Sequence, residues 1–169
     1  MSRCSPRYHD AVTTVMQGHA ITVEVLRDWM PDEHTPSTAT SSSRYLAVAV
    51  GMHVTLTKHS NGWWFGYQAG HAERAKGWLP DICMSLWVVT KAFAMDPSEE
   101  PYHDYLNLKI GDEVVVRDQW REGPWCGWAR GTTRSQIGST TFSTTGLFLL
   151  DHAEQRVIVI CPATMIFDL

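Results

Sequence analysis

A repeated order of motifs is the feature of this 169-residue chain that most constrains its fold. The segment Tyr-Leu-Ala-Val-Ala-Val-Gly at residues 45–51 recurs as Tyr-Leu-Asn-Leu-Lys-Ile-Gly at residues 105–111. Further along, Gly-Trp-Trp-Phe-Gly at residues 62–66 recurs as Gly-Trp-Ala-Arg-Gly at residues 127–131. Because the order is kept twice, the sequence predicts two modules of about 60–70 residues that share one fold.

Short β-strands are predicted for both modules. Residues 21–25 alternate apolar and polar side chains, which is the period of a half-buried strand. Gly, Pro and Asn separate the further β-forming runs, and no segment of the sequence has a sustained helical stripe. The pattern therefore predicts an all-β fold made of small closed or sandwiched β-structures.

The chain divides into four predicted parts. These are an N-terminal extension (1–20), module 1 (21–86), module 2 (87–155) and a β-forming tail (156–169). The extension is left undecided between a tail and an added strand, whereas the apolar tail is expected to add a strand or cover an interface. No Gly/Ser/Pro linker separates the modules, so we expect them to pack together, with residues 84–89 closing one module and beginning the next. Different rotational correlation times for the two halves would contradict this expectation.

Composition narrows the functional classes. The net charge of −4 gives no broad attraction for nucleic acid or an anionic membrane. The four cysteines, at positions 4, 83, 126 and 161, share no metal-ligand spacing and are expected to be free thiols in a reducing compartment. The first residues lack the apolar core of a signal peptide, and no apolar run is long enough to span a bilayer. We therefore expect a cytoplasmic protein with no metal and no cofactor.

Enzyme motifs are absent from the sequence. The eight histidines are scattered, without a metalloprotease motif, a phosphate-binding Gly-rich loop or a nucleophile elbow. Cys126 lies between Trp125 and Trp128 and is expected to be a buried thiol, not an activated one. The chain is therefore expected to be non-catalytic.

Two adjacent tryptophans, Trp63 and Trp64, must point to opposite faces if they lie in a strand. The repeat keeps Trp63 as Trp128 but replaces Trp64 by Ala129. Trp63 is therefore expected to contact a partner, and Trp64 and Ala129 are expected to face the interior of the module or its far side. Two further tryptophans in the loop before Trp128, at positions 120 and 125, are left open between covering the neighbouring module and binding a partner.

The order of these motifs resembles the SH3 domain twice, over about residues 21–155. An SH3 domain has an Ala-Leu-Tyr-Asp-Tyr strand, an acidic RT loop, a Leu-x-Leu/Phe-x-x-Gly-Asp turn, a Trp-Trp strand and a closing Gly-Tyr/Phe-x-Pro-x-x-Tyr segment. The matching residues are 25–29, 46–51, 62–66 and 77–83 in module 1, and 96–100, 106–114, 127–128 and 146–148 in module 2. The resemblance implies two small five-stranded β-barrels in tandem, with little or no linker.

The resemblance also implies a shallow aromatic groove that binds polyproline II segments of other proteins. In module 1 it makes Trp63 the specificity tryptophan and Trp29, Trp78 and Pro80 the lining of the groove. The acids that would pair with a cation of the ligand are Asp32 and Glu33. In module 2 it assigns the aromatic surface and the acids to Phe93, Trp128, Asp96, Glu99 and Glu100.

Several positions depart from the family pattern. Arg27 and Cys83 replace tyrosines in module 1, and Met95, Leu149 and His152 replace a tyrosine, the proline and a tyrosine in module 2. Peptide binding is therefore expected mainly of module 1. The leading interpretation is an adaptor or scaffold that binds proline-rich or extended peptide segments. The alternative is a structural subunit of a larger complex that uses the same fold for packing.

Overall fold

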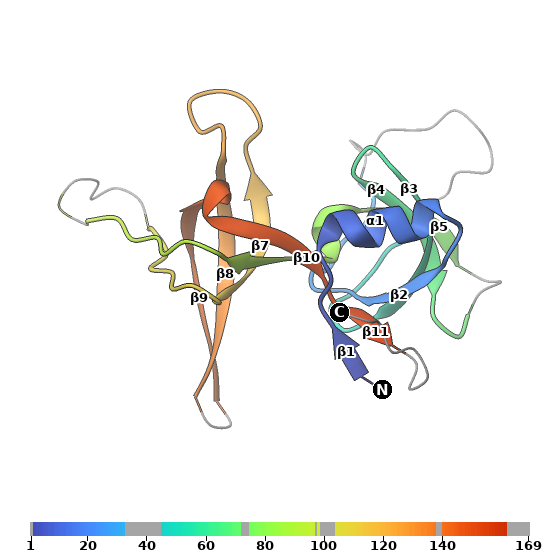
Figure 1. Cartoon of the computed structure of the whole chain (residues 1–169). Helices are drawn as coiled ribbons and strands as arrows, with labels where there is room; N and C mark the ends of the chain where they lie inside the picture. Colours follow the sequence, from blue (N-terminus) through green and yellow to red (C-terminus); the bar gives the residue numbers. More distant parts are fainter. Residues whose placement is uncertain are drawn as a thin grey trace. The chain divides into compact units, whose positions relative to one another are not determined.

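The computed structural model describes residues 2–32, 45–71, 75–96, 98, 104–137 and 140–161. Most of the elements are β-strands, joined by one α-helix and two short 3₁₀ turns, so the predicted all-β class is confirmed (Figure 1). The strands form one sheet of six and one sheet of five. The chain divides into two compact units, which are called unit 1 (up to Ser85 and from Val157 on) and unit 2 (Leu86–Arg156).

Unit 1 contains the six-stranded sheet, with the strand order β1-β11-β2-β3-β4-β5, and each registered pair is antiparallel. Its elements are β1 (Ser2–Cys4), α1 (Tyr8–Met16), β2 (Ile21–Glu24), β3 (His53–Ser60), β4 (Trp63–Gln68), β5 (Lys76–Pro80), the 3₁₀ turn η1 (Asp81–Cys83) and β11 (Val159–Cys161). Three of these, β1, α1 and β11, come from the predicted extension and tail. The structure therefore assigns an added strand and a helix to the extension and an added strand to the tail.

The core of unit 1 follows from the alternation of side chains along its strands. Ile21 and Val23 of β2 and Val54 and Leu56 of β3 are buried, while the residues between them are partly exposed. The helix α1 adds Ala11 and Val15 to the same core cluster, together with Trp64 from β4. α1 is the single α-helix among the described residues, and none of the helices there is long and apolar enough to cross a membrane.

Unit 2 contains the five-stranded sheet in the order β10-β6-β7-β8-β9. Its elements are β6 (Ser85–Val89), β7 (Glu113–Gln119), β8 (Trp128–Ile137), β9 (Thr140–Leu149), η2 (Leu150–His152) and β10 (Ala153–Val157). In the sheet order, β6 lies between β7 and β10, and β11 takes the place beside β2. The expectation that residues 84–89 also close module 1 is therefore wrong, because a strand from after unit 2 fills that position.

The two units repeat the same pairing pattern. Trp29 bridges Val48 in unit 1, and Phe93 bridges Leu108 in unit 2. A register shift interrupts β3 between Leu56 and Lys58, and an equivalent shift interrupts β7 between Val116 and Asp118. Trp63 lies opposite Pro80, as Trp128 lies opposite Leu149.

Neither sheet closes into a barrel through the strand pairs of the described residues. The edge strands are β1 and β5 in unit 1, and β10 and β9 in unit 2. Isolated parallel bridges, Tyr45 with Trp78 and Tyr105 with Leu147, fasten a further segment to β5 and to β9. The prediction of an all-β fold is therefore confirmed in its coarse form, as two open antiparallel sheets.

Candidate functional site

Three aromatic side chains from separate segments of unit 1 contact one another. The ring centroids are 5.8 Å apart for Trp29 and Trp63, 6.1 Å for Trp29 and Tyr45, and 5.5 Å for Tyr45 and Trp63. Each of the three side chains is half-buried. We call this set the unit 1 aromatic cluster. Its rings meet edge-on or tilted, which is the favoured geometry for aromatic pairs and leaves part of each ring accessible.

Backbone pairing positions each ring of the unit 1 aromatic cluster. The amide of Trp29 donates to the carbonyl of Val48 at 2.8 Å, and Val48 donates back at 2.9 Å. Trp63 begins β4 directly after Gly62, whose φ of 79° is a turn conformation that glycine adopts without strain. Since side chains alternate along a strand, Trp63 faces outward while Trp64 is fully buried. Of the two placements predicted for Trp64, the structure shows the interior one.

Two further predicted groove residues lie on the same face of β5. Pro80 is directly opposite Trp63, and Trp78 is directly opposite Phe65. Side chains of directly paired residues share one face of a sheet. Pro80 is thus placed beside the cluster, whereas the ring of Trp78 packs against Phe65 with a centroid distance of 5.4 Å.

Tyr45 is the cluster member that sequence reasoning missed. Its position is set by the bridge to Trp78 and by the neighbouring amide of Leu46, which donates to the Trp78 carbonyl at 2.9 Å. The signal that points to this residue is the repeat itself, because a tyrosine stands at the equivalent position Tyr105.

The predicted acids of unit 1 are placed in part. Asp32 is exposed, and Glu33 lies outside the described residues. The nearby Asp28 accepts a hydrogen bond from the amide of Val50 at 2.7 Å, so its carboxylate holds the turn that follows Val48. The predicted pairing of Asp32 with a ligand cation stays a prediction.

Unit 2 contains a corresponding group, the unit 2 aromatic cluster, formed by Phe93, Tyr105, Trp125 and Trp128. The ring of Trp128 lies 5.9 Å from Phe93, 5.7 Å from Tyr105 and 5.7 Å from Trp125. Trp125 thus packs against Trp128 within unit 2. Phe93 is only 4% exposed, so this cluster is more enclosed on one side than that of unit 1.

The predicted acids of unit 2 are represented by Asp96, which is exposed. Hydrogen bonds from the Ser98 amide (2.9 Å) and hydroxyl (2.7 Å) stabilise the carboxylate and lower the pKa of Asp96. Glu99 and Glu100 lie outside the described residues.

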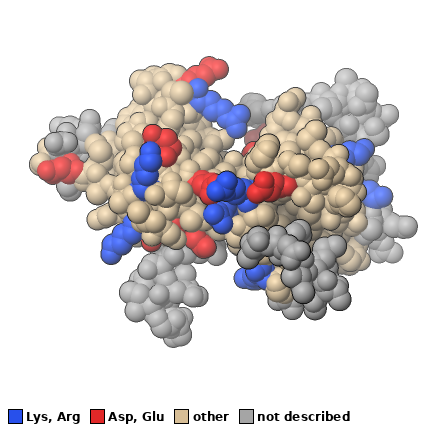
Figure 2. All heavy atoms as spheres, in the orientation of Figure 1, with Lys and Arg blue, Asp and Glu red and all other residues tan. Residues whose placement is uncertain are grey.

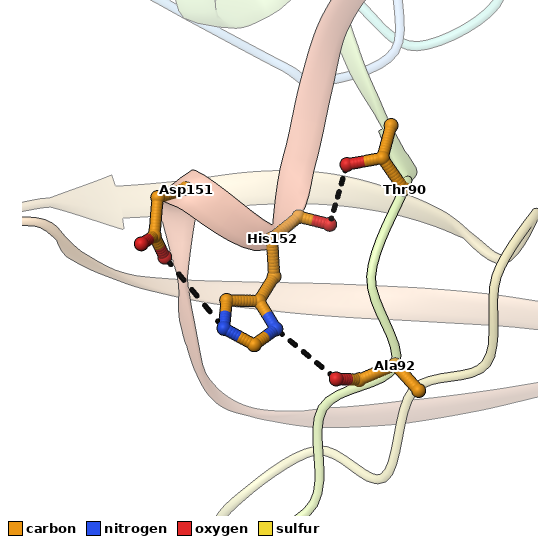
Figure 3. A network of polar contacts seen from close by, with 4 residues as sticks. All are labelled: Thr90, Ala92, Asp151 and His152. Atoms are coloured by element: carbon orange, nitrogen blue, oxygen red, sulfur yellow. Dashed lines mark hydrogen bonds and ion pairs between the residues drawn. The ribbon is translucent and has the colours of Figure 1, made fainter.

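His152 secures the segment that carries Phe93 (Figure 3). Its ring Nδ1 is 3.1 Å from the carbonyl oxygen of Ala92, and because a carbonyl only accepts, this bond requires a proton on Nδ1. The backbone carbonyl of His152 accepts from the amide and the hydroxyl of Thr90, at 2.8 and 3.2 Å. Asp151 lies 3.8 Å from the other ring nitrogen. This histidine thus has a positioning role behind the unit 2 aromatic cluster.

A separate polar cluster attaches α1 to the sheet of unit 1. The hydroxyl of Tyr8 lies 2.8 Å from Nε2 of His59 and 3.1 Å from Oδ2 of Asp81. The His59 ring is 4.5 Å from the ring of Trp64. Burial lowers the pKa of His59, and the nearby Asp81 carboxylate opposes this shift. These residues are far apart in the sequence, so no local motif predicts their meeting.

The described residues also bear on metal binding and thiol chemistry. They contain no group of three or more His, Cys, Asp or Glu side chains that could hold a metal ion. Cys126 is exposed, so the expectation of a buried thiol is wrong. It lies in the turn before β8, where its thiol donates to the carbonyl of Arg121 at 3.1 Å.

Charged side chains are scattered over the face drawn in Figure 2, with acidic and basic groups interspersed on a mostly neutral surface. Comparison of the chain with protein-family models, with curated proteins and with solved structures returned no match. Function is therefore inferred from the geometry of the chain itself.

Proposed function

We propose that this chain is a non-catalytic interaction protein with two SH3-like modules, and that unit 1 binds a proline-rich or otherwise extended peptide. The observation that carries the proposal is the mutual packing of Trp29, Tyr45 and Trp63 with all three rings partly exposed. Flat, rigid aromatic walls bind a peptide that is already extended at a small cost in conformational entropy. Such a protein acts as an adaptor or scaffold.

The order of elements supports the SH3-like assignment. In unit 1 the antiparallel strands β3, β4 and β5 lead directly into the 3₁₀ turn η1, and in unit 2 the strands β7, β8 and β9 lead into η2. This is the order of the Trp-Trp strand and the closing segment that the sequence resemblance implies. The reducing, cytoplasmic location expected from the spacing of the cysteines remains part of the proposal.

Unit 1 is the better candidate for binding because of two differences at equivalent positions. The residue opposite the outward tryptophan is Pro80 in unit 1 and Leu149 in unit 2. Trp29 is half-buried, whereas its equivalent Phe93 is 4% exposed. We therefore expect weaker peptide binding by unit 2. The exposed Asp32 favours ligands that carry an arginine or lysine beside the prolines.

Peptide titration of the full chain tests the proposal. We expect proline-rich peptides with a flanking arginine to bind, and Trp63→Ala to weaken their binding about fivefold or more, because truncating a central aromatic typically removes over about 1 kcal/mol. The matched control is Trp128→Ala at the equivalent position of unit 2, which is expected to leave the main binding event intact. If no such peptide binds the wild type, or if Trp63→Ala binds equally well, the proposal is wrong and the alternative, a structural subunit of a larger complex, is favoured.

A further inference from the structure

We propose that Cys4 and Cys161 are a site of reversible disulfide formation that joins β1 to β11. The two sulfur atoms lie 2.8 Å apart, although the residues are 157 positions apart in the chain. Antiparallel pairing sets Cys4 opposite Val159 and Ser2 opposite Cys161. Since alternate residues share a face, both thiols lie on the same face of this strand pair. Figure 1 shows the two strands side by side.

The positions of the four thiols favour disulfide formation between Cys4 and Cys161 over the other pairs. Cys4 is partly exposed and is the member that a solute reaches, while Cys161 is 3% exposed and lies directly behind it. Cys83 is fully buried, so an oxidant in solution does not reach it. Cys126 is exposed but lies in unit 2. The two sulfurs are 2.8 Å apart, so they must approach each other by less than about 1 Å to reach the length of a disulfide bond.

The reaction is a two-step thiol–disulfide exchange with a small disulfide such as oxidised glutathione as the oxidant. The thiolate of Cys4 attacks one sulfur of the oxidant, and one glutathione thiolate leaves. The thiolate of Cys161 then attacks the sulfur of Cys4, which breaks the mixed disulfide and releases the second glutathione thiolate. The two protein thiols lose two protons and two electrons, and the oxidant is reduced to two thiols. An excess of a small dithiol reverses both steps.

The bond would secure the strand that completes unit 1. In the sheet, β11 lies between β1 and β2, and the amide of Glu24 donates to the carbonyl of Ile158 at 3.0 Å. With three residues β11 is short, and it follows the whole of unit 2 in the chain. Oxidation would therefore lock β11 in place, whereas reduction would leave it held by strand pairing and burial alone.

The test uses the full chain with Cys126→Ser, which removes the exposed thiol and its glutathione adduct. After incubation with oxidised glutathione at mildly alkaline pH, we expect the intact mass to fall by two hydrogen atoms and a non-reducing digest to contain a peptide linking Cys4 and Cys161. Because the bond closes a long loop, we expect Tm to rise by about 10 °C and to return after treatment with dithiothreitol. The rate should increase with pH, since burial and the neighbouring Cys161 raise the pKa of Cys4 to about 11.

Two variants in the same background keep the proposal falsifiable. Adding Cys4→Ser should abolish both the linked peptide and the rise in Tm. Adding Cys161→Ala should leave Cys4 as a stable glutathione adduct, because the second thiol is missing. A persistent glutathione adduct on the parent protein, with no linked peptide, would overturn the proposal. A linked peptide without a change in Tm would overturn the role of the bond in securing β11.

Discussion

Replacing Trp64 by alanine is expected to destabilise unit 1 far more than the same replacement of its neighbour Trp63. Trp64 is fully buried in the core cluster, whereas Trp63 is half-buried on the opposite face of β4. The two substitutions remove the same atoms from adjacent positions of one strand. They therefore compare an interior site with a surface site at equal chemistry.

The expected magnitudes follow from burial. Truncating a fully buried tryptophan costs about 3–5 kcal/mol, while Trp63→Ala should cost less than about 2 kcal/mol. The indole Nε1 of Trp64 is buried without a hydrogen-bond partner among the described residues. Trp64→Phe removes that unsatisfied group and keeps most of the ring, so we expect it to cost less than about 2 kcal/mol.

The equivalent residue pair in unit 2 suggests a second substitution that should compensate for Trp64→Ala. Trp64 is paired with Leu79 across β4 and β5, and the equivalent pair in unit 2 is Ala129 with Phe148. The large aromatic side chain is thus on the other strand, and Ala129 and Phe148 are both fully buried. Combining Trp64→Ala with Leu79→Phe copies this arrangement, and we expect it to recover about 1–3 kcal/mol of the loss.

Native-state hydrogen exchange of the β3 amides measures these effects in unit 1 alone, and urea unfolding followed by circular dichroism gives the transition of the whole chain. The assignment of Trp64 to the core is wrong if Trp64→Ala stays within about 1 kcal/mol of the wild type, or if Trp63→Ala costs as much. If the losses in unfolding free energy caused by Trp64→Ala and Leu79→Phe simply add in the double variant, the Ala129–Phe148 arrangement of unit 2 does not fit the core of unit 1.

Two further predictions concern a close backbone approach and a titrating side chain. Gly66→Ala should destabilise unit 1 by more than about 2 kcal/mol, because its Cβ would meet the backbone oxygen of Thr55, and Gln68→Ala on the same strand is the control in urea unfolding. Acid should weaken the attachment of α1: the pKa of His59 is lowered below 6.5 in the folded chain, so this contribution is complete above pH 6.5 and is lost as the pH falls below it. A thermal melt series over about pH 5–8 should show a fall in Tm on the acid side that is smaller in His59→Gln, and an equal fall in both proteins would contradict the assignment.

Local patterns in the sequence predicted the β-strands and the orientation of the paired tryptophans, since both follow from the two-residue period of a strand. The helix α1 was missed because it contains the β-branched run Val12-Thr13-Thr14-Val15, which favours a strand. Tertiary contacts override that preference: Ala11 and Val15 are buried in the core, and the Tyr8 hydroxyl contacts His59 and Asp81. Helix formation here depends on packing that no local window contains.

The candidate site was predicted only in part, because contacts between distant segments are again not visible in any local stretch of sequence. Trp29 and Trp63 were expected to meet, and their rings do so, whereas Tyr45 was treated only as the start of a strand motif. The pairing of β11 with β1 and β2 joins the two ends of the described chain, and the adjacency of Cys4 and Cys161 follows from it. Contacts across so long a separation depend on the complete topology, which periodicity and motif spacing do not specify.

Comparison of the two units separates what the interior requires from what the outer face retains. Inside, the aromatic side chain stands on β4 in unit 1 and on β9 in unit 2, so either strand of the pair can fill the core. Outside, both units keep a tryptophan at the same register and a tyrosine against it, Tyr45 beside Trp63 and Tyr105 beside Trp128. Since filling the core does not require these outward rings, their accessible apolar surface is the better reason for their presence. The half-buried Trp29 enlarges that surface in unit 1, which is why peptide recognition is proposed for unit 1.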